Sequence, residues 1–167
     1  DAPNTTPRII NVIVNDGSNN SNTATTTITV GASNDAPVLD LDGSAAGTGY
    51  STTFTEAGAG VAGSGPVSIA DTDRSITDVD SSNIVSATIT LTNIQTGDVL
   101  AAGTLPSGIT ASIVGNVVTL SGSATLADYQ TALNAITFNN TTDAPNTTPR
   151  IINVIVNDGS NNSNTAT

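Results

Sequence analysis

Short runs in which apolar and polar residues alternate recur along the whole chain. The clearest run spans Ile84–Thr92, where Val85, Ala87, Ile89 and Leu91 alternate with serine and threonine. Such alternation is typical of a β-strand that buries one face. We therefore expect this strand to direct those four apolar side chains into a core.

Nine further segments combine alternation or β-branched residues with flanking glycine, proline, asparagine or aspartate, which is typical of short strands. Gly115-Asn116 is a two-residue hairpin signal between two of them. Residues 57–66, rich in glycine and alanine, predict a flexible loop. The expected strands are Arg8–Asp16, Asn22–Val30, Val38–Asp42, Tyr50–Glu56, Val99–Leu100, Ile109–Val114, Val117–Leu120, Ile136–Asn140 and Arg150–Asp158.

One segment follows a helical period instead. Over residues 125–135, Leu126, Tyr129, Ala132 and Leu133 fall on one helical face, and Thr125 can cap the N-terminus. We expect this short helix to connect two strands. Many short strands with regularly spaced turn signals and a single helix predict an all-β sandwich.

The chain contains one of its own segments twice. Residues 1–25 recur letter for letter as residues 143–167, a period of 142 residues because Asp1 returns as Asp143. Such identity indicates a tandem array of domain-sized repeats. We expect residues 1–33 to be the C-terminal hairpin of a preceding repeat with its linker, and residues 34–167 to be one repeat that lacks the end of its last strand. The N-terminal hairpin would complete that open edge, within one molecule or between molecules.

The net charge and the absence of certain residue types argue against several classes of function. The net charge is −11, and the chain has no histidine, cysteine or lysine. An acidic surface disfavours nucleic acid and anionic lipid as partners, and no apolar run is long enough for insertion into a membrane. A serine nucleophile lacks a conventional base, and one glutamate with few aromatic residues gives little support for glycoside hydrolysis. We therefore expect no enzyme, no catalytic residue and no organic cofactor.

Aspartates recur in Asp-x-Asp pairs that suit a hard cation. Asp71 with Asp73, and Asp78 with Asp80, each point to one side of an extended segment, because residues two apart share a face. Such carboxylates repel one another unless a cation lies between them, and Ca²⁺ prefers roughly six to eight oxygen ligands. We expect these four residues to bind calcium, the alternative being that aspartate simply favours turns and solubility.

Two further polar pairs are candidate ligands. Asp40 and Asp42 form a third Asp-x-Asp pair, for which calcium binding and turn formation both remain open. Asn34 and Asp35 lie at the expected domain junction, where an ion could bridge neighbouring repeats.

Several motifs resemble those of cadherin-like repeats. The junction Asn34-Asp35-Ala36-Pro37 resembles their linker, although it lacks the full acidic run of animal cadherins. Together with that linker, Glu56 and Asp71-Thr72-Asp73 resemble the acidic elements that hold junction calcium in cadherins. Four motifs are similar to the cadherin-like repeats of giant bacterial adhesins exported by type I secretion (RTX-type adhesins): Ser86–Leu91, Leu105–Ile109, Leu126–Tyr129 and Val154–Gly159.

This resemblance implies an immunoglobulin-like or cadherin-like sandwich, calcium that stiffens a string of domains, and an extracellular role in adhesion or biofilm at the bacterial surface. The expected function is that of a structural extender whose partners are identical repeats in the same chain or in another chain. Two alternatives remain open. One is a module that binds exopolysaccharide or another glycan, and the other is a self-assembling filament or surface-layer subunit formed by strand complementation.

Overall fold

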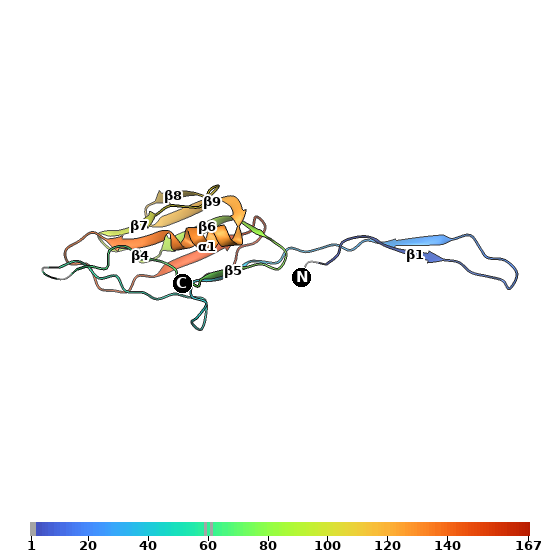
Figure 1. Cartoon of the computed structure of the whole chain (residues 1–167), viewed down its shortest axis with the longest axis horizontal. Coiled ribbons are helices and arrows are strands. Elements are labelled where there is room, and N and C mark those ends of the chain that lie inside the picture. The colour runs from blue at the N-terminus through green and yellow to red at the C-terminus, as the bar shows by residue number, and fades with distance from the viewer. Residues whose placement is uncertain (1–2, 59, 61) are drawn as a thin grey trace. The chain divides into compact units, whose positions relative to one another are not determined.

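The structure, a computed structural model, describes residues 3–58, 60 and 62–167 (Figure 1). Residues 1 and 2 of the expected N-terminal hairpin segment, and residues 59 and 61 of the expected glycine-rich loop, lie outside this range. The chain divides into two compact units, the first ending at Asn34 and the second comprising Asp35–Thr167. We call them unit 1 and unit 2.

Unit 1 contains an antiparallel hairpin of β1 (Arg8–Val12) and β2 (Ala24–Ile28). Arg8 lies opposite Ile28, and Val12 lies opposite Ala24. Both strands appear where alternation predicted them, although they are shorter, because hydrogen bonds between turn residues already begin at Val14.

Unit 2 is built from three antiparallel sheets and one helix. The largest sheet has the strand order β11-β6-β9-β8, the second β4-β10-β7, and the third pairs β3 with β5. The helix α1 (Leu126–Asn134) connects β9 to β10 and contacts β5, β6, β9 and β10. The strands are β3 (Val38–Asp40), β4 (Val67–Ser68), β5 (Ser75–Thr77), β6 (Asn83–Leu91), β7 (Asp98–Ala102), β8 (Thr110–Val114), β9 (Val117–Thr125), β10 (Ile136–Asn140) and β11 (Ile152–Asn157).

The core of unit 2 combines residues of both larger sheets with the apolar face of α1. Ile89 and Val154 of the largest sheet, Ile136 of the second sheet and Tyr129 of the helix are all fully buried and belong to one hydrophobic cluster. This architecture confirms the prediction of an all-β, sandwich-like fold with one short helix.

The structure contradicts one predicted strand, Tyr50–Glu56, which forms no assigned strand. Its backbone is hydrogen-bonded near its two ends, where Tyr50 N donates to Thr167 O at 3.1 Å and Ser64 N donates to Thr55 O at 2.8 Å. A strand needs a partner along its length. Between those ends, residues 51–54 line a groove together with residues of β4 and β10 and with Ile152 of β11.

The repeated sequence adopts the same turn in both units. Gly17 has a φ of 100° and its copy Gly159 a φ of 106°, a region that glycine occupies without strain. Asn15 Nδ2 donates to Asn20 Oδ1 at 2.7 Å, and the copy of this bond also measures 2.7 Å. Since the strands beside the turn are exposed in unit 1 but contribute buried residues to the core in unit 2, we infer that local hydrogen bonds determine the turn.

Candidate metal centre

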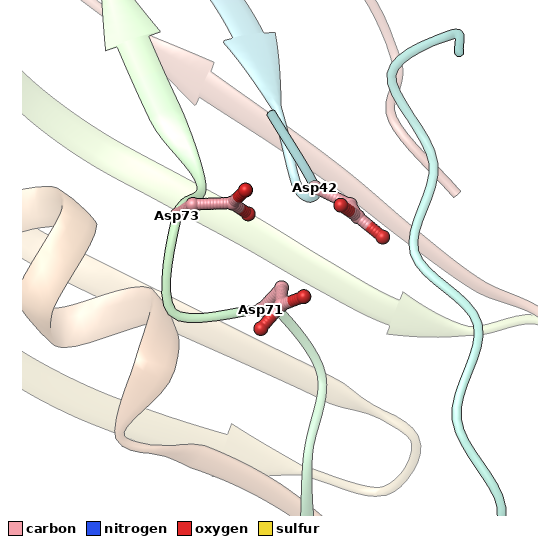
Figure 2. A group of neighbouring side chains, drawn as sticks. All are labelled: Asp42, Asp71 and Asp73. Atoms are coloured by element: carbon pink, nitrogen blue, oxygen red, sulfur yellow. The ribbon is translucent and has the colours of Figure 1, made fainter. Parts of the chain in front are cut away.

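Three carboxylates converge at one edge of unit 2. Oxygen atoms of Asp42, Asp71 and Asp73 all lie within 4.8 Å of one another. Figure 2 shows the three side chains gathered in the space between the end of the β3 segment and the loop before β5. Asp42 and Asp71 are partly buried, whereas Asp73 is exposed, so an ion could reach the group from solvent.

Strand pairing brings these residues together. Asp42 follows β3, and Asp71 and Asp73 precede β5, the strand that pairs antiparallel with β3. Asp71 N donates to Leu41 O at 2.8 Å, which fixes the loop against the end of β3. Gly43 permits a close approach on the other side, because a Cβ there would lie 2.8 Å from the carbonyl oxygen of Asp73.

Hydrogen bonds orient each carboxylate. Asp73 Oδ1 accepts from Gly43 N at 3.2 Å, and Asp71 Oδ1 accepts from Thr72 N at 2.5 Å. Asp42 Oδ1 accepts from Ser44 Oγ at 2.9 Å. All three carboxylates therefore accept hydrogen bonds from neighbouring loop residues.

The neighbouring cation, Arg74, is directed at backbone rather than at carboxylates. Its Nη1 donates to Asp71 O at 2.8 Å, and its Nε donates to Gln130 O of α1. Burial lowers the pKa of Arg74, and the nearby charge of Asp71 acts in the opposite direction. Arg74 therefore ties the loop to the helix, and a divalent cation with oxygen ligands would offset the charge of the three carboxylates.

The other predicted ligands lie elsewhere. Asp40 Oδ1 accepts from Asp42 N at 3.0 Å, so Asp40 supports the loop that carries Asp42. Glu56 is partly buried and lines a groove of about 240 Å³ together with Asp143. Asn34 is the last residue of unit 1.

Asp35, Asp78 and Asp80 form a second acidic turn. Asp78 Oδ1 accepts from Asp80 N at 3.1 Å and from Ser81 N at 2.9 Å. Asp80 Oδ2 accepts from Asp35 N at 3.1 Å. Asp78 Oδ2 is buried and has no hydrogen-bond partner among the residues that the structure describes. Only in the first group do three carboxylates within the described ranges come close enough to share an ion.

Sequence reasoning placed Asp71 and Asp73 in one candidate site but left Asp42 in a separate pair with Asp40. It also gave no role to Arg74 in holding the loop. Within the described part of the chain, Asp42, Asp71 and Asp73 make up the one group of three or more potential metal ligands. Gly43, which follows Asp42, was the one sequence feature that could have indicated the grouping, because a glycine there allows the backbone to approach Asp73.

No family model, curated protein or solved structure matches this chain significantly. Among the described residues, no helix is long and apolar enough to cross a membrane.

Proposed function

We propose that this chain is a structural repeat of an extended adhesion protein at the bacterial surface, and that Ca²⁺ bound by Asp42, Asp71 and Asp73 stiffens it. The observation that carries the proposal is the convergence of three carboxylates from two chain segments. An ion there would cross-link the end of β3 to the loop before β5. The loop is in turn anchored to α1 through Arg74.

The internal repeat supports the extender role. Exact recurrence of residues 1–25 after 142 residues is typical of tandem arrays, in which the number of domains sets the length of the protein. The resemblance to cadherin-like repeats of secreted adhesins points to the same role. In such a string, calcium that fixes loops within each domain would reduce bending.

The first test is titration of the chain with CaCl₂ in a calorimeter, with MgCl₂ as a comparison. We expect saturable calcium binding and weaker magnesium binding, because Mg²⁺ demands a smaller, octahedral site. Thermal melts in calcium and in EGTA give the second readout. At free calcium about 100-fold above Kd, the expected increase in Tm is about 5–10 °C.

Variants assign the effect to the three carboxylates. The double variant Asp71→Asn with Asp73→Asn should lose both the heat of binding and the increase in Tm. Asp16→Asn, which alters a turn residue of unit 1, should retain both. The pair Asp78→Asn with Asp80→Asn reports whether the second acidic turn also binds an ion. Equal Tm values in calcium and in EGTA would mean that the three aspartates act only in turns and in solubility.

A further inference from the structure

The strand β8 forms one edge of the largest sheet in unit 2 and is exposed along its whole length. It is the last strand in the order β11-β6-β9-β8, and Figure 1 shows it at the margin of unit 2. All five of its residues are exposed, Ile113 by 44% and Val114 by 74%. Such an edge presents unpaired backbone groups that can pair with another strand.

The hairpin turn determines which backbone groups of β8 point outward. A two-residue turn joins β8 to β9 and closes with a hydrogen-bonded pair, here Val114 and Val117. Hydrogen-bonded and non-hydrogen-bonded pairs alternate along an antiparallel ladder. Ser112 therefore bonds to β9, whereas the N–H and C=O groups of Ala111 and Ile113 point away from it. These outward groups have no hydrogen-bond partner in the part of the chain that the structure describes.

The apolar inner face of the largest sheet extends past its cover at β8. Ile113 lies directly opposite Val118 of β9 and therefore lies on the same face of the sheet. Val118 is fully buried in the core, whereas Ile113 is 44% exposed. The apolar layer thus ends at a partly covered isoleucine, and a further strand beside β8 would continue this layer.

β8 lacks the features that usually prevent edge-to-edge pairing. Charged residues, proline, bulges and a short length all oppose such pairing. The strand contains neither a charged residue nor proline, and its register against β9 is continuous. Other edges of unit 2 have such features, since β7 begins with Asp98, β5 lies between Asp73 and Asp78, and β4 has two residues.

The charge distribution favours a second copy of this chain as the partner of β8. The net charge is −11, so two copies repel one another at long range. Residues 99–127, which include β8 and β9, contain no charged residue. Two copies can therefore meet at this edge with little local repulsion. The same stretch contains no aromatic side chain that could stack against a sugar ring.

We propose that β8 is a self-association edge, at which two copies of this chain pair their β8 strands antiparallel. A two-fold axis at Ser112 places this residue opposite itself. Ala111 then lies opposite Ile113 of the second copy, and their outward groups exchange backbone hydrogen bonds. Because one sequence supplies both strands, the contact closes on itself and produces a dimer.

This register suits the backbone and the side chains together. Every outward N–H group of β8 meets an outward C=O group, whereas other registers pair fewer of these groups within the strand. The exposed side chain of Ile113 packs against Ala111 across the pair, and Val114 lies opposite Thr110. The dimer therefore removes apolar side chains from water and satisfies the open edge at the same time.

The pairing deepens the proposed extender role, because it names a second copy as the lateral partner. Its link to adhesion rests on that proposed function, but the pairing itself uses no metal ligand. Asp42, Asp71 and Asp73 lie beside β3 and β5, which form a different sheet. In a tandem array each repeat would present the same edge, so weak single contacts would add up to a strong lateral attachment.

The first experiment measures self-association of the full chain. Sedimentation velocity from about 10 μM to about 1 mM should show a reversible monomer–dimer equilibrium in EGTA as well as in calcium. Added NaCl should shift it towards the dimer, because salt screens the repulsion between two acidic chains. Calcium binding without dimers would overturn the pairing alone, and dimers without calcium binding would overturn the metal site alone.

A matched pair of lysine substitutions locates the contact. Ser112→Lys places like charges opposite each other at the two-fold axis and should weaken the dimer by about tenfold or more. Thr119 lies directly opposite Ser112 on the inner neighbour β9, so Thr119→Lys adds the same charge to the same face away from the edge. This variant should retain the dimer, and thermal melts verify that both variants fold.

Cysteine substitutions test the register, because the chain contains no cysteine. The Cα atoms of a non-hydrogen-bonded antiparallel pair are about 4.5 Å apart, within reach of a disulfide. Ser112→Cys should therefore form a disulfide-linked dimer roughly tenfold faster than Thr110→Cys under mild oxidation. Thr110 is exposed on the same strand and face, but the two-fold axis places it about 14 Å from its own copy.

A chain that stays monomeric over the whole concentration range would overturn the proposal. Equal losses of dimer in the two lysine variants, or equal rates of cross-linking in the two cysteine variants, would also contradict it. Binding of a polysaccharide or an unrelated peptide strand to the monomer, lost with Ser112→Lys, would assign the edge to a different occupant and would likewise overturn self-association.

Discussion

At the scale of single residues, the repeat provides two arginines in the same sequence context. Arg150 Nε donates to Asp98 Oδ2 at 2.7 Å, and the two side chains are 12% and 0% exposed. Its copy Arg8 donates to backbone oxygens of Asn4 and Thr6. Since breaking a buried ion pair costs about 3–5 kcal/mol, Arg150→Met should lower the free energy of unfolding of unit 2 by about 3 kcal/mol. Arg8→Met should change it little.

Urea denaturation followed by tyrosine fluorescence measures both arginine variants, because Tyr50 and Tyr129 both lie in unit 2. Equal losses of stability would contradict the assigned role of the ion pair.

The same pair makes stability depend on pH. Burial raises the pKa of Asp98, but hydrogen bonds from Arg150, Asn140 and the backbone of Gln95 together outweigh it, so the pKa lies below its ordinary value. A carboxyl group whose pKa is lower in the folded than in the unfolded state stabilises the folded state at pH values above its unfolded pKa of about 3.9. This stabilisation is lost as the pH falls through the folded pKa. Unfolding of Asp98→Asn should therefore depend less on pH between about pH 5 and pH 2 than unfolding of the original chain. Parallel stability curves would show that Asp98 is not the group responsible.

Gly122 has a steric requirement that a sequence alone does not reveal. Its φ is 128°, and a Cβ would lie 1.9 Å from the carbonyl oxygen of Gly108. Gly108 has a φ of 87° but open space around it. We expect Gly122→Ala to lower the free energy of unfolding by about 3 kcal/mol or more. Gly108→Ala should lower it by about 1 kcal/mol, because that substitution causes backbone strain but no clash. Similar unfolding midpoints in urea for the two variants would contradict the clash.

At the scale of elements, the helices, strands and turns whose sequence signals lie within a few neighbouring residues were predicted with nearly the observed bounds. The strand Ile136–Asn140 has the expected bounds, and α1 buries Tyr129, Ala132 and Leu133 as its period predicted. The Gly115-Asn116 turn joins β8 to β9, with Val114 opposite Val117. Capping, helical period and turn chemistry each act within a few residues, which is why the sequence carries them.

Elements that depend on a neighbour were predicted less well. Alternation placed Val85 in the core, but Ile84 is fully buried instead, because the register of β6 against β9 shifts between the pairs Ile84–Ala124 and Ser86–Ser121. Tyr50–Glu56 has the composition of a strand but lacks a partner along its middle.

The helix cap allows a direct test of local stabilisation. Thr125 Oγ1 accepts from Asp128 N at 3.1 Å and satisfies one of the free donors at the helix start. Thr125→Ala should therefore lower the free energy of unfolding by about 1 kcal/mol. Thr131→Ala, at an exposed position in the same helix, should be neutral or slightly stabilising because alanine is the better helix former. Thermal melts of the two variants would contradict the assignment if Thr131→Ala were the more damaging change.

At the scale of the whole molecule, the candidate site shows where sequence reasoning ends. Spacing indicated that Asp71 and Asp73 act together, because two residues apart on an extended segment share a face. It did not indicate that Asp42 joins them, because that depends on the pairing of β3 with β5 across about thirty residues of chain. Long-range pairing is set by the core, and no local pattern records it.

If Asp42, Asp71 and Asp73 bind calcium as proposed, the effect of Asp73→Asn on stability should change sign when calcium is added. Without a cation, the carboxylate of Asp73 repels those of Asp42 and Asp71, so Asp73→Asn should stabilise the chain in EGTA by about 0.5 kcal/mol. The asparagine oxygen can still accept the hydrogen bond from Gly43 N. In excess calcium the variant lacks one charged ligand, and a tenfold loss of affinity should destabilise it by about 1.4 kcal/mol relative to the original chain. If Asp73 served only the turn, urea unfolding would show an effect of the same sign in both buffers.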